Sequence, residues 1–69
     1  MKDGVFLIQM GAKIKAIRKA KNISLDILCE DNAFDRSNLS RLESGKINPK
    51  VLTLKQLADK LGVDVKDFI

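Results

Sequence analysis

Apolar residues recur every three or four positions along almost the whole chain, which is the spacing of an amphipathic α-helix. No stretch alternates strictly between apolar and polar residues, and none is enriched in β-branched residues, so the pattern gives no indication of a sheet. The sequence therefore predicts an all-α fold. No internal repeat, linker or low-complexity segment interrupts the pattern, which indicates a single domain over residues 1–69.

The apolar stripes predict five helices. They cover residues 5 or 8 to 21, 25–31, 36–44, 51–61 and 65–69. Residues 1–9 are either an N-terminal extension or the beginning of the first helix, ahead of a core of residues 10–69, and we favour the helical extension. The residues expected in the core are Phe6, Met10, Ile14, Ile17, Leu28, Cys29, Leu39, Leu42, Val51, Leu54, Leu57, Ala58 and Leu61.

Residues that favour helix ends stand between these stripes. Ser24, Asp35 and Asp64 are good N-caps for the helices that follow them. Asn22, Gly45 and Gly62 suit the left-handed conformation that ends a helix. The segment from Lys46 to Pro49 is predicted to be a loop, because proline cannot continue the preceding helix.

The helix predicted over residues 36–44 has two different faces. At 100° per residue, Leu39, Leu42 and Glu43 lie on one side, whereas Ser37, Ser40, Arg41 and Ser44 lie on the other. The second face is small and polar and is built around an arginine. A helix that enters a DNA major groove needs such a face, because it must approach the bases closely and offer hydrogen bonds to them.

A short helix, a turn of about four residues and this third helix form a helix-turn-helix. Further residues in a fixed order accompany it: Met10-Gly11, Ile14, Ile17-Arg18, Ile23-Ser24, Leu28, Ser40-Arg41, Leu42-Glu43, Gly45, Pro49, Leu54, Leu57-Ala58 and Leu61-Gly62-Val63. With these residues the chain resembles the lambda-repressor-like, or Cro/Xre-type, DNA-binding family over about residues 10–69. The resemblance implies a compact five-helix domain that binds double-stranded DNA and regulates transcription, for which we expect repression.

The resemblance also implies roles for particular residues. Arg36, Ser37, Asn38 and Arg41 match the positions that address base edges or nearby phosphates, and an arginine favours guanine. Lys46, Asn48 and Lys50 lie in the loop that touches the DNA backbone in this family, and Ser24, Ser40 and Ser44 are further candidates for phosphate contacts. Arg18 and Glu43 match positions that often hold an ion pair between the first and third helices.

Three features depart from the family pattern. Leu25 stands where glutamine is common, so the brace that this glutamine gives the third helix is not expected here. Asn32-Ala33 replaces a turn that usually contains glycine, although Asn32 tolerates the left-handed conformation. Four carboxylates lie on or beside the motif, namely those of Asp26, Glu30, Asp31 and Asp35. They keep a second function class open, a protein-interaction module such as an antitoxin or antirepressor.

Charge and composition fit a DNA-binding protein and disfavour other classes. Thirteen basic residues against nine acidic ones leave a net charge of +4, with basic blocks at 13–21 and 36–55 that can follow a phosphate backbone. The chain has no histidine and one cysteine, so it lacks the usual residues for general-base catalysis, a zinc site or an internal disulfide. We therefore expect neither an enzyme nor a cofactor or metal. The only concentrated apolar run is too short for a signal sequence or a membrane span, so we expect a cytoplasmic protein.

A homodimer is the economical expectation, because one module of this size contacts only a few base pairs. The candidate surfaces are an N-terminal one of Val5, Phe6, Leu7 and Ile8 and a C-terminal one of Val63, Val65, Phe68 and Ile69. No effector-binding domain is expected within these residues. The operator sequence and the sign of regulation stay open.

Overall fold

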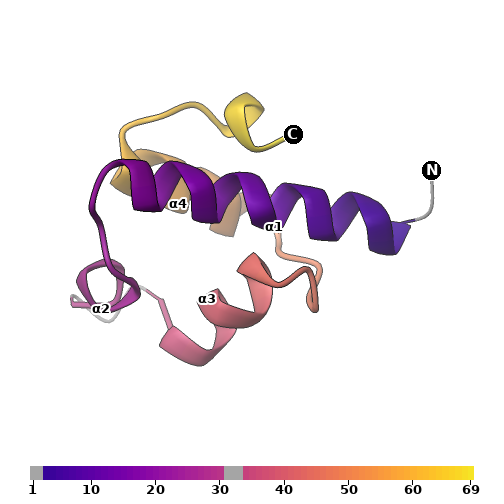
Figure 1. Cartoon of the computed structure of the whole chain (residues 1–69), viewed down its shortest axis with the longest axis horizontal. Coiled ribbons are helices and arrows are strands. Elements are labelled where there is room, and N and C mark those ends of the chain that lie inside the picture. Colours follow the sequence, from indigo (N-terminus) through magenta and orange to yellow (C-terminus); the bar gives the residue numbers. More distant parts are fainter. Residues whose placement is uncertain (1–2, 31–33) are drawn as a thin grey trace.

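The computed structural model describes residues 3–30 and 34–69. Within these ranges the elements are α1 (Asp3–Ala20), α2 (Leu25–Leu28), α3 (Arg36–Glu43), α4 (Val51–Leu61) and the 3-10 helix η1 (Val65–Phe68) (Figure 1). The all-α prediction is confirmed, but the number of five α-helices is wrong, because the last element is not an α-helix. Its chain closes with i to i+3 hydrogen bonds, from Asp67 N–H to the Asp64 carbonyl at 2.9 Å and from Ile69 N–H to the Lys66 carbonyl at 3.4 Å. Over the described residues, no helix combines the length and apolarity needed to cross a membrane.

Most of the predicted helix ends are confirmed. The Ser24 hydroxyl accepts a hydrogen bond from Ile27 N–H at 3.1 Å and so caps α2. Asn22, Gly45 and Gly62 have φ angles of 58°, 74° and 70°, the left-handed conformation expected of them. Asp35 occupies the N-cap position of α3, but its side chain makes no capping hydrogen bond, so that part of the prediction is wrong.

Two helices differ from the sequence prediction by more than one residue at one end, and the first of them, α1, begins already at Asp3. The apolar run at residues 5–8 lies inside α1, as favoured, although Leu7 packs against the core and Phe6 is exposed. Either Leu7 or Phe6 fits the inward position of the helical period, so the period alone does not determine which of the two is buried. Helix α2 ends at Leu28, earlier than expected, and the predicted turn at Asn32-Ala33 lies outside the described residues.

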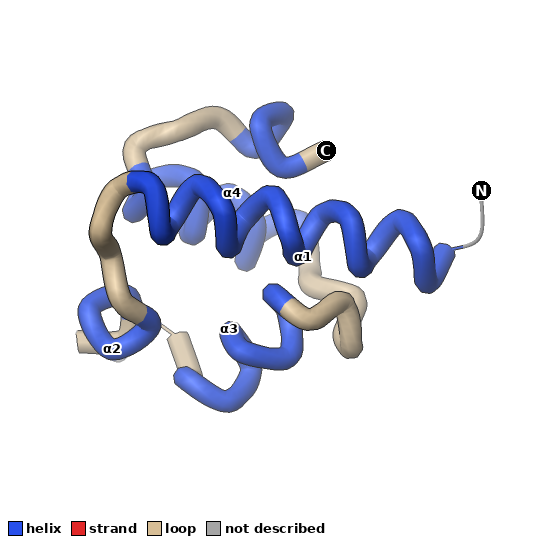
Figure 2. The backbone as a smooth tube through the Cα atoms, in the orientation of Figure 1, coloured by secondary structure: helices blue, strands red, loops and turns tan. Residues whose placement is uncertain are grey.

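The core gathers side chains from all five elements. Its buried members are Met10, Ile14, Leu28, Leu39, Leu42, Leu54, Leu57, Ala58, Leu61 and Phe68. Val51 was expected among them but is exposed at the first position of α4, so the buried stripe of that helix begins at Leu54. Phe68 is 0% exposed, because η1 packs against α1 and α4, and its assignment to a C-terminal dimer surface is therefore wrong. The tube in Figure 2 shows η1 folded back toward α1.

Cys29 is half-buried and packs against this core as a free cysteine. Burial raises the pKa of its thiol, and the carboxylates of Asp26 and Asp35 act in the same direction. The thiol is therefore uncharged at neutral pH and behaves as the small apolar side chain that the sequence suggested.

Candidate nucleic-acid interface

One arginine fixes α3 against the rest of the molecule. Arg18 donates from Nε to Glu43 Oε2 at 2.7 Å and from Nη2 to Glu43 Oε1 at 3.0 Å, and its Nη1 donates to the Ile23 carbonyl at 2.8 Å. The two side chains are only 9% and 6% exposed, and the hydrogen bond to Glu43 raises the pKa of Arg18 although burial acts against it. The guanidinium of α1 thus contacts both α3 and the segment that precedes α2. These contacts set the orientation of α3.

The outward face of α3 is exposed. Leu39, Leu42 and Glu43 are buried, whereas Arg36, Ser37, Asn38, Ser40, Arg41 and Ser44 are all exposed. At 100° per residue, Ser37, Arg41 and Ser44 form the centre of the exposed arc, while Arg36 and Asn38 lie at its two edges. The division into two faces that the sequence predicted is therefore confirmed.

The two edges of this arc meet different neighbours. On one edge, Arg36 Nε donates to Asp26 Oδ1 of α2 at 2.7 Å. On the other, Asn38 borders a hollow of about 200 Å³ beneath the start of α4. The full lining of this hollow is Phe34, Asp35, Asn38, Leu39, Leu42, Ile47, Pro49 and Thr53.

The residues expected to touch phosphates flank α3. Lys46, Asn48 and Lys50 are exposed in the loop that leads from α3 to α4. Ser24 uses its oxygen as an acceptor for the α2 cap, which leaves its hydroxyl hydrogen for a phosphate. The Ser44 hydroxyl instead donates to the Ser40 carbonyl at 3.0 Å, so its hydrogen is already engaged within the helix.

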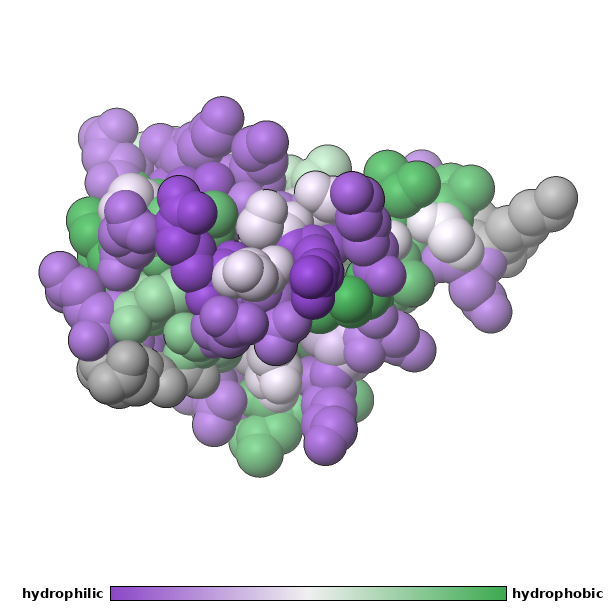
Figure 3. All heavy atoms as spheres, turned by 90° about the horizontal axis from the view of Figure 1, so that it is seen from below, coloured by the Kyte–Doolittle hydropathy of each residue, from purple (hydrophilic) through white to green (hydrophobic). Residues whose placement is uncertain are grey.

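The surface around α3 is mainly polar (Figure 3). Figure 3 views the molecule from the side on which α3 lies in Figure 1, and this side is largely hydrophilic with smaller hydrophobic areas. One hydrophobic area lies toward the end at which α1 begins, where Val5, Phe6 and Ile8 are exposed. A polar face around α3 thus lies beside an exposed apolar projection at the start of α1.

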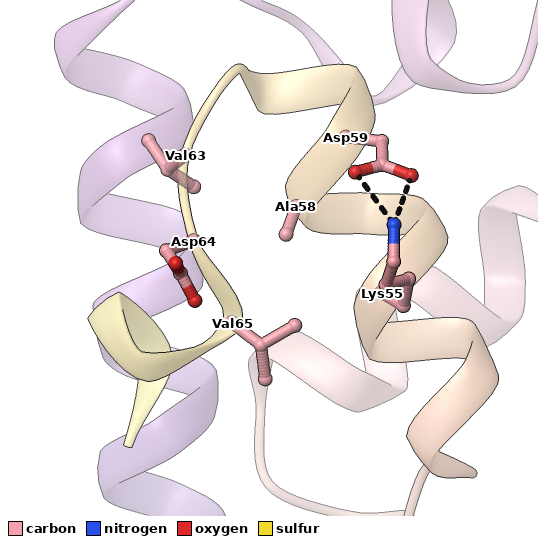
Figure 4. Close-up of a pocket in the computed structure, with 6 residues that line it drawn as sticks. All are labelled: Lys55, Ala58, Asp59, Val63, Asp64 and Val65. Carbon is pink, nitrogen blue, oxygen red and sulfur yellow. Dashed lines mark hydrogen bonds and ion pairs between the residues drawn. The ribbon is translucent and has the colours of Figure 1, made fainter.

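A second cavity lies away from α3. It has a volume of about 150 Å³ and is formed by Lys55, Ala58 and Asp59 of α4 together with residues 63–65 (Figure 4). The lysine is engaged by the aspartate, with Nζ 2.9 and 3.2 Å from the two carboxylate oxygens. None of the predicted DNA-contacting residues lines this cavity, and the described residues contain no cluster of carboxylate or thiol groups that could hold a metal ion.

The contact between Asp26 and Arg36 was not predicted from the sequence. There the carboxylate was considered only as a charge that opposes DNA binding. The helical period carries no information about contacts between exposed side chains of different helices. The position of each residue gave an available clue, since both lie in the first turns of helices that a helix-turn-helix brings together. The ion pair is thus a direct contact between α2 and α3.

Comparison with known protein families identifies the family to which this helix-turn-helix belongs. The family model described as a helix-turn-helix domain matches residues 11–69. The chain belongs to the lambda-repressor-like helix-turn-helix family. This family membership confirms the resemblance that the order of residues suggested.

Two relatives of this helix-turn-helix chain are similar in sequence. The immunity repressor protein of Bacillus phage phi105 is 35% identical over 60 residues, which cover 87% of this chain and 42% of the repressor. The uncharacterized HTH-type transcriptional regulator y4dJ of Sinorhizobium fredii is also 35% identical over 60 residues, which cover 87% of this chain and 78% of that protein. The chain thus spans less than half the length of the phage repressor.

Solved structures of helix-turn-helix proteins have the same fold. The DNA-binding domain of BldD has a TM-score of 0.87 and 30% identity, covering 100% of this chain and 99% of that one. The restriction-modification controller protein C.AhdI of Aeromonas hydrophila has a TM-score of 0.85 and 25% identity, covering 91% and 96%. An HTH_3 family transcriptional regulator of Vibrio cholerae has a TM-score of 0.87 and 27% identity, covering 97% and 38%.

Proposed function

We propose that this chain is a transcriptional regulator, and specifically a repressor, that binds a defined sequence of double-stranded DNA through α3. The observation that carries the proposal is the division of α3 into a buried face, locked by Arg18 and Glu43, and an exposed polar face centred on Arg41. The phage relative named as an immunity repressor supports the regulatory role. The function is one of binding without a catalytic step, and its place of action is the cytoplasm, where the duplex is accessible.

Sequence reading falls to the exposed arc of α3. Arg36 and Arg41 each present a guanidinium that bonds two acceptors of a guanine in the major groove, which typically gives about 1–3 kcal/mol of discrimination per base pair. Ser37 and Asn38 are short enough to let the helix approach and can bond several bases. We expect the loop residues Lys46 and Lys50 to position the helix by contacts to phosphates, without reading sequence.

The proposal includes a homodimer, because two copies related by a two-fold axis read half-sites about 34 Å apart and double the number of base contacts. The apolar projection of α1 is the better candidate for the contact between copies. Val5, Phe6 and Ile8 are 43%, 38% and 56% exposed there, whereas the C-terminal surface loses Phe68 to the core. In water, a second copy that covers these side chains removes an unfavourable exposed surface.

The test is to select bound duplexes from a randomised pool with the wild-type chain and with Arg36→Ala. We expect the wild type to enrich a palindromic site and the variant to lose the preference at one base pair of each half-site. Enrichment of a single half-site without a palindrome contradicts the homodimer. Weak binding with no enriched site contradicts sequence-specific recognition and directs attention to a protein partner, as for an antitoxin or antirepressor.

A further inference from the structure

The exposed ion pair between Asp26 and Arg36 joins the two helices of the helix-turn-helix. Asp26 is the second residue of α2 and Arg36 is the first residue of α3. Their side chains are 76% and 63% exposed, and Arg36 Nε lies 2.7 Å from Asp26 Oδ1. The pair therefore lies at the edge of the surface on which DNA is proposed to bind.

This pair adds little to the stability of the free protein. An exposed ion pair gains little, since water screens the charges and two side chains lose freedom. What the contact does fix is the direction of the guanidinium. A side chain with several rotatable bonds is held in one position at the start of α3, which reduces the entropy that must be lost when a ligand binds.

Arg18, which contacts α3, and Arg36, which begins α3, use their nitrogen atoms differently. All three guanidinium nitrogens of Arg18 donate hydrogen bonds, two of them to Glu43 and one to the Ile23 carbonyl. Arg36 donates only from Nε, to Asp26, and among the described residues no hydrogen bond engages its Nη1 or Nη2. Its two terminal nitrogens thus remain as a pair of donors at the end of a side chain that Asp26 holds at Nε.

We propose that Asp26 is a positioning residue that sets Arg36 for end-on recognition of a guanine, with Nη1 and Nη2 donating to O6 and N7. This inference rests on the proposed function and deepens it. With Nε occupied, the side-on approach through Nε and one terminal nitrogen is closed, so a single geometry remains. When DNA covers the pair and removes water, the attraction between carboxylate and guanidinium strengthens, which favours the bound geometry.

The carboxylate has a second, opposite effect on binding. A negative charge beside the duplex repels phosphates whatever their sequence. Removal of Asp26 is therefore expected to strengthen binding to any duplex while it weakens the preference for guanine. Removal of a purely structural residue, or of one that only repels DNA, would not raise the affinity for any duplex and at the same time lower the preference for guanine.

The experiment measures Kd for the enriched site and for the same duplex with the guanine opposite Arg36 replaced. That base pair is identified as the one whose preference Arg36→Ala abolishes. We expect a ratio of about 10-fold or more for the wild type. We expect Asp26→Ala to reduce the ratio to about threefold or less and to bind the replaced duplex more tightly, and we expect Asp26→Asn, which keeps an acceptor for Nε, to retain an intermediate ratio.

Two controls make the outcome decisive. Glu30→Ala removes another exposed carboxylate near α2 and should leave the ratio unchanged. Asp26→Ala in an Arg36→Ala background should cause no further loss of discrimination, and its unfolding temperature should match that of the parent. If Asp26→Ala tightens binding to both duplexes equally, the carboxylate only repels DNA and the inference is wrong. If the wild type enriches no site, the proposed function itself fails, and the inference falls with it.

Discussion

Gly11→Ala is expected to lower the free energy of unfolding by about 3 kcal/mol, at the upper end of the usual cost of adding atoms to a packed interior. Gly11 lies where α1 meets the end of α3. A Cβ atom there would stand 2.6 Å from the Glu43 carbonyl oxygen and 2.8 Å from the carbonyl carbon. Both atoms belong to the backbone, so no side chain can rotate away, and the two helices must separate.

The matched control is Gly4→Ala in the same helix. No heavy atom outside the local helix lies within 4 Å of a Cβ at that position, and alanine favours a helix over glycine by up to about 1 kcal/mol. Urea and thermal unfolding of both variants measure the difference. We expect Gly4→Ala to unfold at or above the wild-type temperature and Gly11→Ala about 15 °C or more below it. Equal stability of the two variants would show that α1 and α3 do not approach so closely.

Arg18→Ala is expected to destabilise the protein by about 3 kcal/mol, because it leaves the Glu43 carboxylate buried without its partner. The Ile23 carbonyl loses its donor in the same variant. A chain of 69 residues commonly has roughly 3–5 kcal/mol of stability, so we expect a large unfolded fraction at 25 °C. Chemical denaturation followed by circular dichroism measures this loss.

Replacement of both partners distinguishes a loss of charge pairing from a loss of packing. In Arg18→Met with Glu43→Leu no charge remains buried, and we expect most of the lost stability to return. Arg18→Lys keeps the charge but cannot form the same paired hydrogen bonds, and an intermediate stability is expected. An unchanged melting temperature in Arg18→Ala would mean that the ion pair does not fix α3 in solution.

Much of the fold could be predicted because local chemistry determines it. Helix α4 begins and ends at the predicted residues, since Pro49 excludes a helix before it and Gly62 adopts the left-handed conformation after it. The two faces of α3 followed from the helical period. The burial of Phe68 did not follow, because it depends on how the chain folds back after Gly62, and a period within one element carries no information about that return.

The candidate site divides in the same way. Which side chains of α3 point outward is set by the helix itself, and the pairing of Arg18 with Glu43 was available from the family resemblance. The contact between Asp26 and Arg36 depends on the angle between two helices and on the rotamers of two exposed side chains. Their opposite charges can be read from the sequence, whereas only the assembled motif brings the two groups within a hydrogen bond.

Recognition through α3 is tested most directly by a fluorescence-anisotropy titration of a labelled duplex that carries the enriched site, at about 150 mM salt. Wild type is compared with Arg41→Ala and with Lys66→Ala, a variant of equal charge change in η1, which lies on the other side of α1 from α3 in Figure 1. We expect Arg41→Ala to weaken binding at least tenfold and Lys66→Ala less than twofold. Equal weakening by the two variants would contradict recognition through α3 and would leave only attraction by net charge.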